Sequence, residues 1–108
     1  MITVNIRYKG TNGSALEFAR EKIGSGTADR IRRETGNLRY EYYQSLEDPE
    51  VILLVDSWTD QEAIERHHAS GMMEVIMKLR EKYDLHMEAV RFREDEGIPE
   101  ADQAFIRQ

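Results

Sequence analysis

The residues best suited to chemistry lie in the stretch from 56 to 70, where the only tryptophan, Trp58, precedes His67. Ala63 and Ile64 lie four and three residues before His67, so these side chains share one face of a predicted helix. An imidazole titrates near neutrality and can take a phenolic proton or hold a phenolate by a hydrogen bond. These residues make His67 a candidate for proton transfer in a space where a small aromatic ligand could lie. The alternative is that both rings only pack in the core.

Three further residues are candidates for binding a substrate beside Trp58. Asn5 and Arg7 lie on the polar face of the first predicted strand. They could bind a carbonyl or hydroxyl group, be solvated, or lie in an interface between subunits. Tyr40 belongs to a group of tyrosines in the second predicted strand, most of which we expect to pack.

No pattern in the sequence is typical of a metal, nucleotide or phosphate site. The chain contains no cysteine, which excludes disulfides, thiolate metal centres and cysteine nucleophiles. His67 and His68 are adjacent, and neighbouring side chains on a helix point about 100° apart, so they are poorly placed to share one metal ion. We therefore predict no metal and no cofactor, and we expect His68 and His86 at the surface or in an interface.

Length and charge narrow the class of protein. The chain has 108 residues, of which 40% are hydrophobic and 33% charged, as expected for one soluble globular domain. Its net charge of −6 disfavours nucleic-acid binding, and the cations of the first predicted helix, Lys22 among them, alternate with glutamates as on a solvated face. The longest apolar run, residues 51–55, is too short to cross a bilayer, and no secretory leader is visible. We expect a cytoplasmic protein with no membrane partner.

Alternating apolar and polar residues predict four strands, and apolar spacings of three and four predict helices between them. Ser14 and Glu17 form a predicted capping box for one helix, and Thr59 and Glu62 form one for another. Two glycines, at 24 and 26, and a Ser-Gly pair at 70 and 71 interrupt the helical patterns. The predicted strands are residues 2–9, 38–44, 51–58 and 85–92, and the predicted helical stretches begin at Ser14, Thr27, Thr59 and Met72.

The order strand, helix, strand, strand, helix, strand is that of the split βαβ unit. We therefore predict an α+β, ferredoxin-like fold with a four-stranded antiparallel sheet. The domain takes in residues 1–93, and residues 94–108 form an acidic C-terminal extension. The strand at 51–58 is apolar on both faces, yet the helices can cover only one of them. We predict a homodimer packed sheet against sheet, and the alternative is that the tail covers its own sheet.

Three segments resemble the antibiotic biosynthesis monooxygenase domain family, a group of small dimeric α+β barrel proteins. Residues 34–40 are similar to the family's E-x-G-x-L-x-Y pattern, residues 56–60 to its acidic-x-W-x-D strand end, and residues 62–70 to its E-A-L-x-x-H-x-x-S helix. The resemblance covers residues 1–93. After Ser70 the chain continues with glycine and two methionines, where the family often has a proline and a second histidine or aromatic residue.

This resemblance implies a dimer with a pocket between sheet and helices, and oxidation of a phenol or quinol by O2 without a cofactor. It implies that the pocket helps to deprotonate the substrate, whose anion then reacts with oxygen. His67 would be the base or the partner of the phenolate, Trp58 a stacking wall and Asn5 a polar anchor, with Tyr40 as a further candidate.

Two other functions remain open on the same resemblance. One is a non-oxidative isomerase of the autoinducer-2 processing type, in which Arg7 or Arg39 would bind a phosphosugar-like ligand. The other is a non-catalytic binding or stress module. Haem-degrading relatives carry a histidine near the position of Met77, so haem binding is disfavoured.

Overall fold

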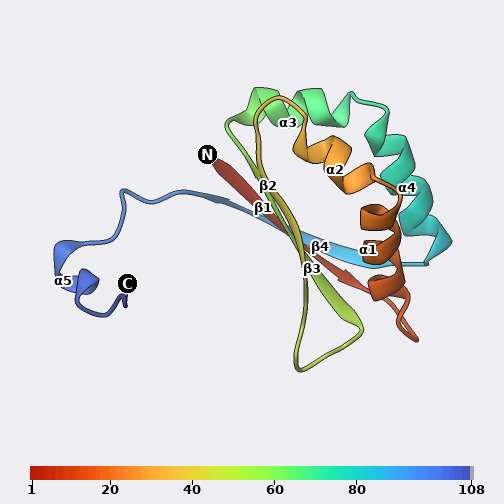
Figure 1. Ribbon diagram of the computed structural model, residues 1–108, viewed down its shortest axis with the longest axis horizontal. Coiled ribbons are helices and arrows are strands. Elements are labelled where there is room, and N and C mark those ends of the chain that lie inside the picture. Colours follow the sequence, from red (N-terminus) through yellow and green to blue (C-terminus); the bar gives the residue numbers. More distant parts are fainter. Residues whose placement is uncertain (108) are drawn as a thin grey trace.

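Four strands form one antiparallel sheet in the order β2-β3-β1-β4, and helices α1 to α4 lie on one side of it (Figure 1). This is the α+β, ferredoxin-like fold that the order of the elements predicts. The structure, a computed structural model, describes residues 1–107. The elements are β1 (Ile2–Lys9), α1 (Ser14–Gly24), α2 (Thr27–Arg32), β2 (Asn37–Gln44), β3 (Val51–Trp58), α3 (Gln61–His68), α4 (Met72–Lys82), β4 (His86–Arg93) and α5 (Glu100–Gln103).

Strand β1 lies in the middle of the sheet and sets the register of both neighbours. Ile2 pairs with Trp58 of β3 on one side and with Arg93 of β4 on the other. Because side chains alternate along a strand, every second residue faces the helices. On β1 these helix-facing positions include the buried Ile2 and Tyr8, and on β3 they include Leu54 and Trp58. The hydrophobic core therefore lies between the sheet and the helices.

Both helical stretches are interrupted where the sequence predicts. Gly26 has a φ of +83°, a left-handed conformation that suits glycine, and it separates α1 from α2. Helix α2 ends at Arg32, and the N–H of Glu34 then donates to the carbonyl oxygen of Ile31 in a tighter turn. A second break after residue 68 separates α3 from α4.

Both predicted capping boxes are wrong in detail. The residue preceding α1 is Gly13, which has no side chain to cap the helix, and the Ser14 hydroxyl instead accepts the N–H of Thr11 at 2.9 Å. At α3 the cap is Asp60, whose carboxylate accepts the N–H of Ala63 at 2.9 Å, one residue later than the predicted Thr59. The extended backbone of Asp60 lets its side chain reach back over the first turn.

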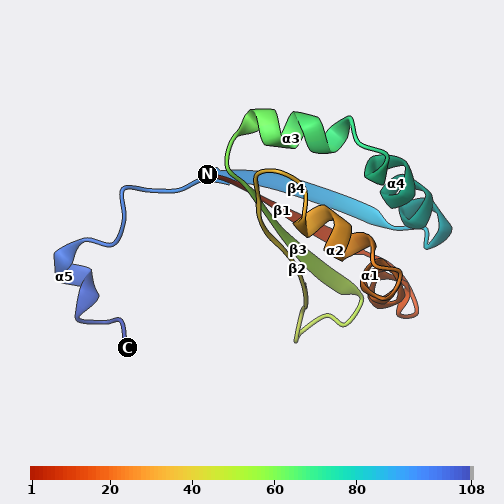
Figure 2. The same ribbon diagram turned by 45° about the horizontal axis from the view of Figure 1, so that its top comes forward.

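The face of the sheet turned away from the helices is uncovered. Val90 and Phe92 of β4 are 54% and 51% exposed on this outer face. The C-terminal segment does not cover it, because α5 has no buried residue and lies away from the sheet (Figures 1 and 2). Phe105 is 87% exposed. The alternative in which the tail folds over its own sheet does not occur in this structure.

Gly36, between α2 and β2, allows a close approach that the site requires. Its φ is +88°, and the N–H of Thr59 donates to its carbonyl oxygen at 2.9 Å. A Cβ atom on Gly36 would lie 2.6 Å from the Cβ of Ala63 and 2.8 Å from Oγ1 of Thr59. Only glycine therefore lets the entry to β2 lie against the start of α3.

We expect Gly36→Ala to lower the free energy of unfolding by about 2–4 kcal/mol, through backbone strain and overpacking together. Chemical denaturation measures this change. Gly13→Ala is a matched control, since Gly13 has a φ of +80° with no atom within 4 Å of the added Cβ. The control should lose only about 1–2 kcal/mol from backbone strain. Equal losses in both variants would contradict the close approach at Gly36.

Candidate functional site

A cavity of about 320 Å³ lies between the sheet and helices α3 and α4, and we refer to it as the chamber. Its apolar lining includes Ile6, Leu54 and Ile76, and its polar lining includes residues from all four strands and both helices. The lining residues of β4 are exposed, so the chamber opens toward solvent along this strand. The polar residues around it are Tyr8, Tyr40, Asp56, Trp58, His67, His68, Arg80 and Arg91.

His67 borders the chamber with its imidazole held on two sides. The side chain is 5% exposed and stacks on the Trp58 indole, with ring centroids 4.8 Å apart and an angle of 29° between the planes. Its Nδ1 lies 2.6 Å from Oε2 of Glu34. Burial lowers the pKa of His67, and the Glu34 carboxylate opposes this effect. A neutral imidazole that donates Nδ1–H to Glu34 keeps Nε2 free to accept a proton.

Glu34 reaches His67 because two distant turns are joined. Helix α2 ends two residues before Glu34, and the Asn37 N–H donates to the Glu34 carbonyl as the chain turns into β2. The hydrogen bond between Thr59 and Gly36 then ties this turn to the start of α3. The carboxylate consequently acts as a positioning partner that orients the imidazole.

Lys22 is fully buried behind the chamber, which makes the predicted solvated position wrong. Phe18 and Lys22 lie one turn apart on α1, so both face the sheet. The Lys22 ammonium donates to the Tyr40 hydroxyl at 2.6 Å and lies 4.9 Å from the centre of the Tyr40 ring. Burial lowers the pKa of Lys22 to about 7, and the charge of Asp56 opposes this shift. Alternation of charges along a helix cannot reveal which cation faces inward.

Asp56 is a carboxylic acid of the chamber lining that is almost fully buried. Its side chain lies on the helix-covered face of β3, and the residue is 6% exposed. Among the residues described, its Oδ1 is the buried side-chain atom without a hydrogen-bond partner. Burial raises the pKa of Asp56 to about 7, and a hydrogen bond from Trp58 and the charge of Lys22 oppose the rise. A buried carboxylate with an unpartnered oxygen is available to accept a hydrogen bond from a ligand.

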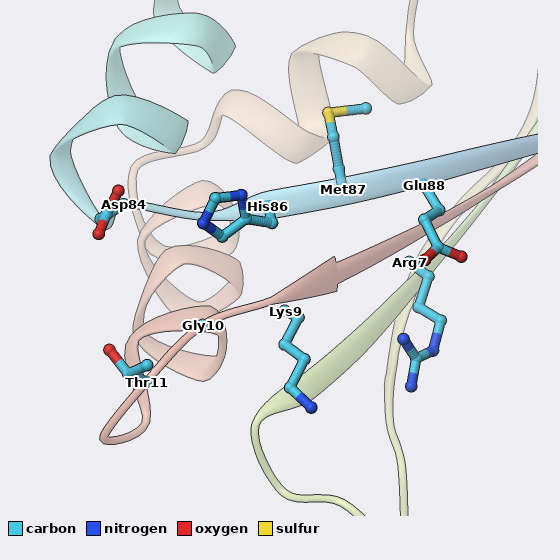
Figure 3. Close-up of a pocket in the computed structure, with 8 residues that line it drawn as sticks. All are labelled: Arg7, Lys9, Gly10, Thr11, Asp84, His86, Met87 and Glu88. Carbon is cyan, nitrogen blue, oxygen red and sulfur yellow. The ribbon is translucent and has the colours of Figure 1, made fainter.

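The structure brings His67, Trp58 and Tyr40 together around the chamber but leaves Asn5 and Arg7 outside it. Strand alternation places Asn5 and Arg7 on the outer face of the sheet. Arg7 borders a separate hollow of about 440 Å³ on that face. Figure 3 shows Arg7 and Glu88 extending to one side of the strands. Arg39 pairs with the outer-face residue Ser57, so it also lies on that face.

Other predicted positions divide between the two faces. His68 lines the chamber and His86 lines the outer hollow. Met87 lies on the chamber side, and in Figure 3 it points away from Arg7 and Lys9. Within residues 1–107 no cluster of three or more acidic or histidine side chains is arranged to hold a metal ion. No helix in this part of the chain has the length and apolar character needed to cross a membrane.

Sequence reasoning missed Glu34, Lys22 and Asp56 as residues of the site. Asp56 carried a usable signal, because a carboxylate stands at an inward-facing position of the most apolar strand. Glu34 stands in one of the segments that resemble the family, but its spacing from His67 shows nothing of their contact. Tertiary packing alone brings those two residues together.

Residues 1–79 match the sequence model of the family described as antibiotic biosynthesis monooxygenase. The chain belongs to this family. No curated protein sequence matches the chain.

Solved structures of the family's fold superpose on the whole domain. A candidate antibiotic biosynthesis monooxygenase from Deinococcus radiodurans has a TM-score of 0.79 at 17% identity, covering 92% of this chain and 97% of that one. SnoaB, a cofactor-independent oxygenase from Streptomyces nogalater, has a TM-score of 0.73 at 21% identity, with the same coverage of 92% and 97%. A conserved Methanosarcina mazei protein has a TM-score of 0.74 at 23% identity, covering 87% and 92%. At these identities the similarity establishes the fold.

The raised pKa of Asp56 predicts a pH dependence of stability that Asp56→Asn should remove. An acid that holds its proton more tightly when folded contributes stability below its unfolded pKa and loses it as the pH rises through the folded value. For Asp56 that window runs from pH 3.8 to about 7. Urea denaturation across it should show the wild type losing more than about 1 kcal/mol relative to Asp56→Asn. A difference between the two proteins that stays constant with pH would contradict the assignment.

Proposed function

We propose that this protein is a cofactor-independent monooxygenase that oxidises a quinol or phenol with O2. The observation that carries this proposal is His67, a buried imidazole oriented by Glu34 at the edge of an apolar chamber. Such a site can exclude water from an aromatic ring while offering its hydroxyl group a proton acceptor. Membership of the monooxygenase family and the likeness to a cofactor-independent oxygenase support the same reading.

The proposed reaction begins with proton transfer from the substrate hydroxyl to Nε2 of His67. The electron pair of the broken O–H bond stays on the substrate oxygen, and Glu34 stabilises the imidazolium that forms. The electron-rich anion then reacts with O2. A quinol and O2 together give a hydroxyquinone and water, so the substrate itself supplies the electrons that reduce the second oxygen atom.

Trp58 and Tyr40 serve this reaction as parts of the chamber wall. The Trp58 indole stacks on His67 and limits how the imidazole can turn. Tyr40 is 2% exposed and receives the hydrogen bond of Lys22, so its ring is firmly placed. Asn5 and Arg7 have no part in the proposal, because the sheet separates them from the chamber.

A second candidate function is isomerisation of a small anionic ketone without oxygen. Arg80 and Arg91 line the chamber and could bind a phosphate group, although they are not the arginines that the sequence suggested. Turnover in the absence of O2 that depends on these two residues would favour this function over the oxidation.

We also propose that two copies of the chain pack through the outer face of the sheet. Val90 and Phe92 expose apolar side chains there, and Leu53 and Val55 of β3 lie on the same face. Neither the helices nor the C-terminal segment covers this surface. A second copy can bury it sheet against sheet, which is the arrangement expected from a strand that is apolar on both faces.

We expect His67→Gln to reduce kcat/KM for a reduced naphthoquinone by about 10²–10⁴-fold, because the variant keeps a similar volume but cannot accept the proton. Oxygen consumption, measured with an electrode, gives the rate. His86→Gln changes a histidine on the outer face and should retain the wild-type rate. Wild-type turnover by His67→Gln would remove the assigned role, and a wild-type protein that consumes no oxygen with quinols would contradict the function.

Light scattering after size exclusion should give twice the chain mass of 12.6 kDa for the wild type. Phe92→Asp should give the mass of a single chain, because a carboxylate would be buried in the proposed interface. Met77→Asp is the control, since Met77 is also 51% exposed but belongs to α4 on the helix side. A single-chain mass for the wild type would rule out the proposed dimer.

A further inference from the structure

The most informative group that the proposed reaction leaves unused is Asp56. A buried polar atom without a partner costs about 1–3 kcal/mol, so an unpartnered Oδ1 in the core needs an explanation. Asp56 lies between Val4 and Tyr40 in the sheet, and it lines the chamber. The residue is 6% exposed, so bulk solvent does not readily satisfy the free oxygen.

The position of Asp56 relative to His67 follows from the strand. Asp56 and Trp58 share the helix-facing side of β3 two residues apart, which separates their Cα atoms by about 7 Å. His67 stacks on Trp58, and Asp56 and His67 both line the chamber, so one ligand in the chamber can contact both side chains.

We propose, on the basis of the proposed function, that the substrate is a dihydroxy aromatic compound held at both ends. His67 receives one hydroxyl, and Oδ1 of Asp56 accepts a hydrogen bond from the other. When the quinol is oxidised, the second O–H bond breaks, its proton moves to Oδ1, and its electron pair stays with the substrate. Asp56 is therefore a second catalytic residue, and it selects a quinol over a simple phenol.

Lys22, which is buried next to Tyr40 of the chamber lining, supports this role of Asp56. Its ammonium is fully buried and bonded to the Tyr40 hydroxyl, and Tyr40 is the cross-strand neighbour of Asp56. The positive charge favours the ionised carboxylate, which is the form that accepts a proton.

Anaerobic calorimetric titration with 1,4-dihydroxynaphthalene and 1-naphthol tests the proposal, because these ligands share a ring system and differ by one hydroxyl. The wild type should bind the diol about tenfold more tightly, as expected for one hydrogen bond to a charged acceptor. Asp56→Leu should bind both ligands equally. Asp56→Asn, which keeps a neutral acceptor and the original shape, should retain a smaller preference and reports on the site if the leucine variant does not fold. Asp95→Leu, in the exposed C-terminal segment, should behave as the wild type.

The outcomes separate this inference from the proposed function. Equal binding of the two ligands by the wild type, binding of neither, or an undiminished preference for the diol in the Asp56 variants would overturn the role of Asp56. Oxygen consumption by the wild type with a reduced naphthoquinone is measured independently and decides the oxidation itself. If the Asp56 variants lose the preference for the diol over 1-naphthol, Asp56 binds the second hydroxyl group, whether or not the protein consumes oxygen.

Discussion

The alternation of side chains along β3 is the constraint on which the site depends. Antiparallel pairing with β1 and β2 fixes the register, so residues 52, 54, 56 and 58 share the face that the helices cover. Burial of Trp58 stabilises the fold. Asp56 lies in the same buried layer, where one of its carboxylate oxygens is removed from solvent and has no hydrogen-bond partner. A shift of one residue would free Asp56 but turn Trp58 to the outer face. The register that forms the core also places a carboxylate in the chamber.

Two other buried polar groups near the chamber are paired across long sequence separations. His67 meets Glu34 from the turn before β2, and Lys22 of α1 meets Tyr40 of β2. Each pair stabilises a buried polar group that would otherwise lose water without compensation. Asp56 differs, because its Oδ1 has no hydrogen-bond partner among the described residues. Such an oxygen can be useful to a protein where a bound ligand supplies the missing hydrogen bond. These polar groups support the proposal that the chamber binds a ligand.

The chamber itself results from the way short helices cover a sheet. The connections from β1 to β2 and from β3 to β4 each carry two helices, which are separated by turns at Gly26 and after His68. Helices α3 and α4, of 8 and 11 residues, lie over the sheet near β4 and leave a cavity between themselves and the strands. The result is an apolar volume closed by helices and bordered by titratable groups. A pocket of this kind suits a flat aromatic ring whose hydroxyl groups need acceptors.

The sequence by itself determined the order of the elements and the interruptions in both helical stretches, because periods of two and of three to four are local properties of the chain. It also singled out His67, whose place on the apolar face of its helix follows from spacing alone. Only the tertiary structure decided that Glu34 orients His67 and that Lys22 is buried. It also decided that the sheet separates Asn5 and Arg7 from the chamber. These facts depend on which segments meet in space, and contacts between residues tens of positions apart leave no local pattern to read.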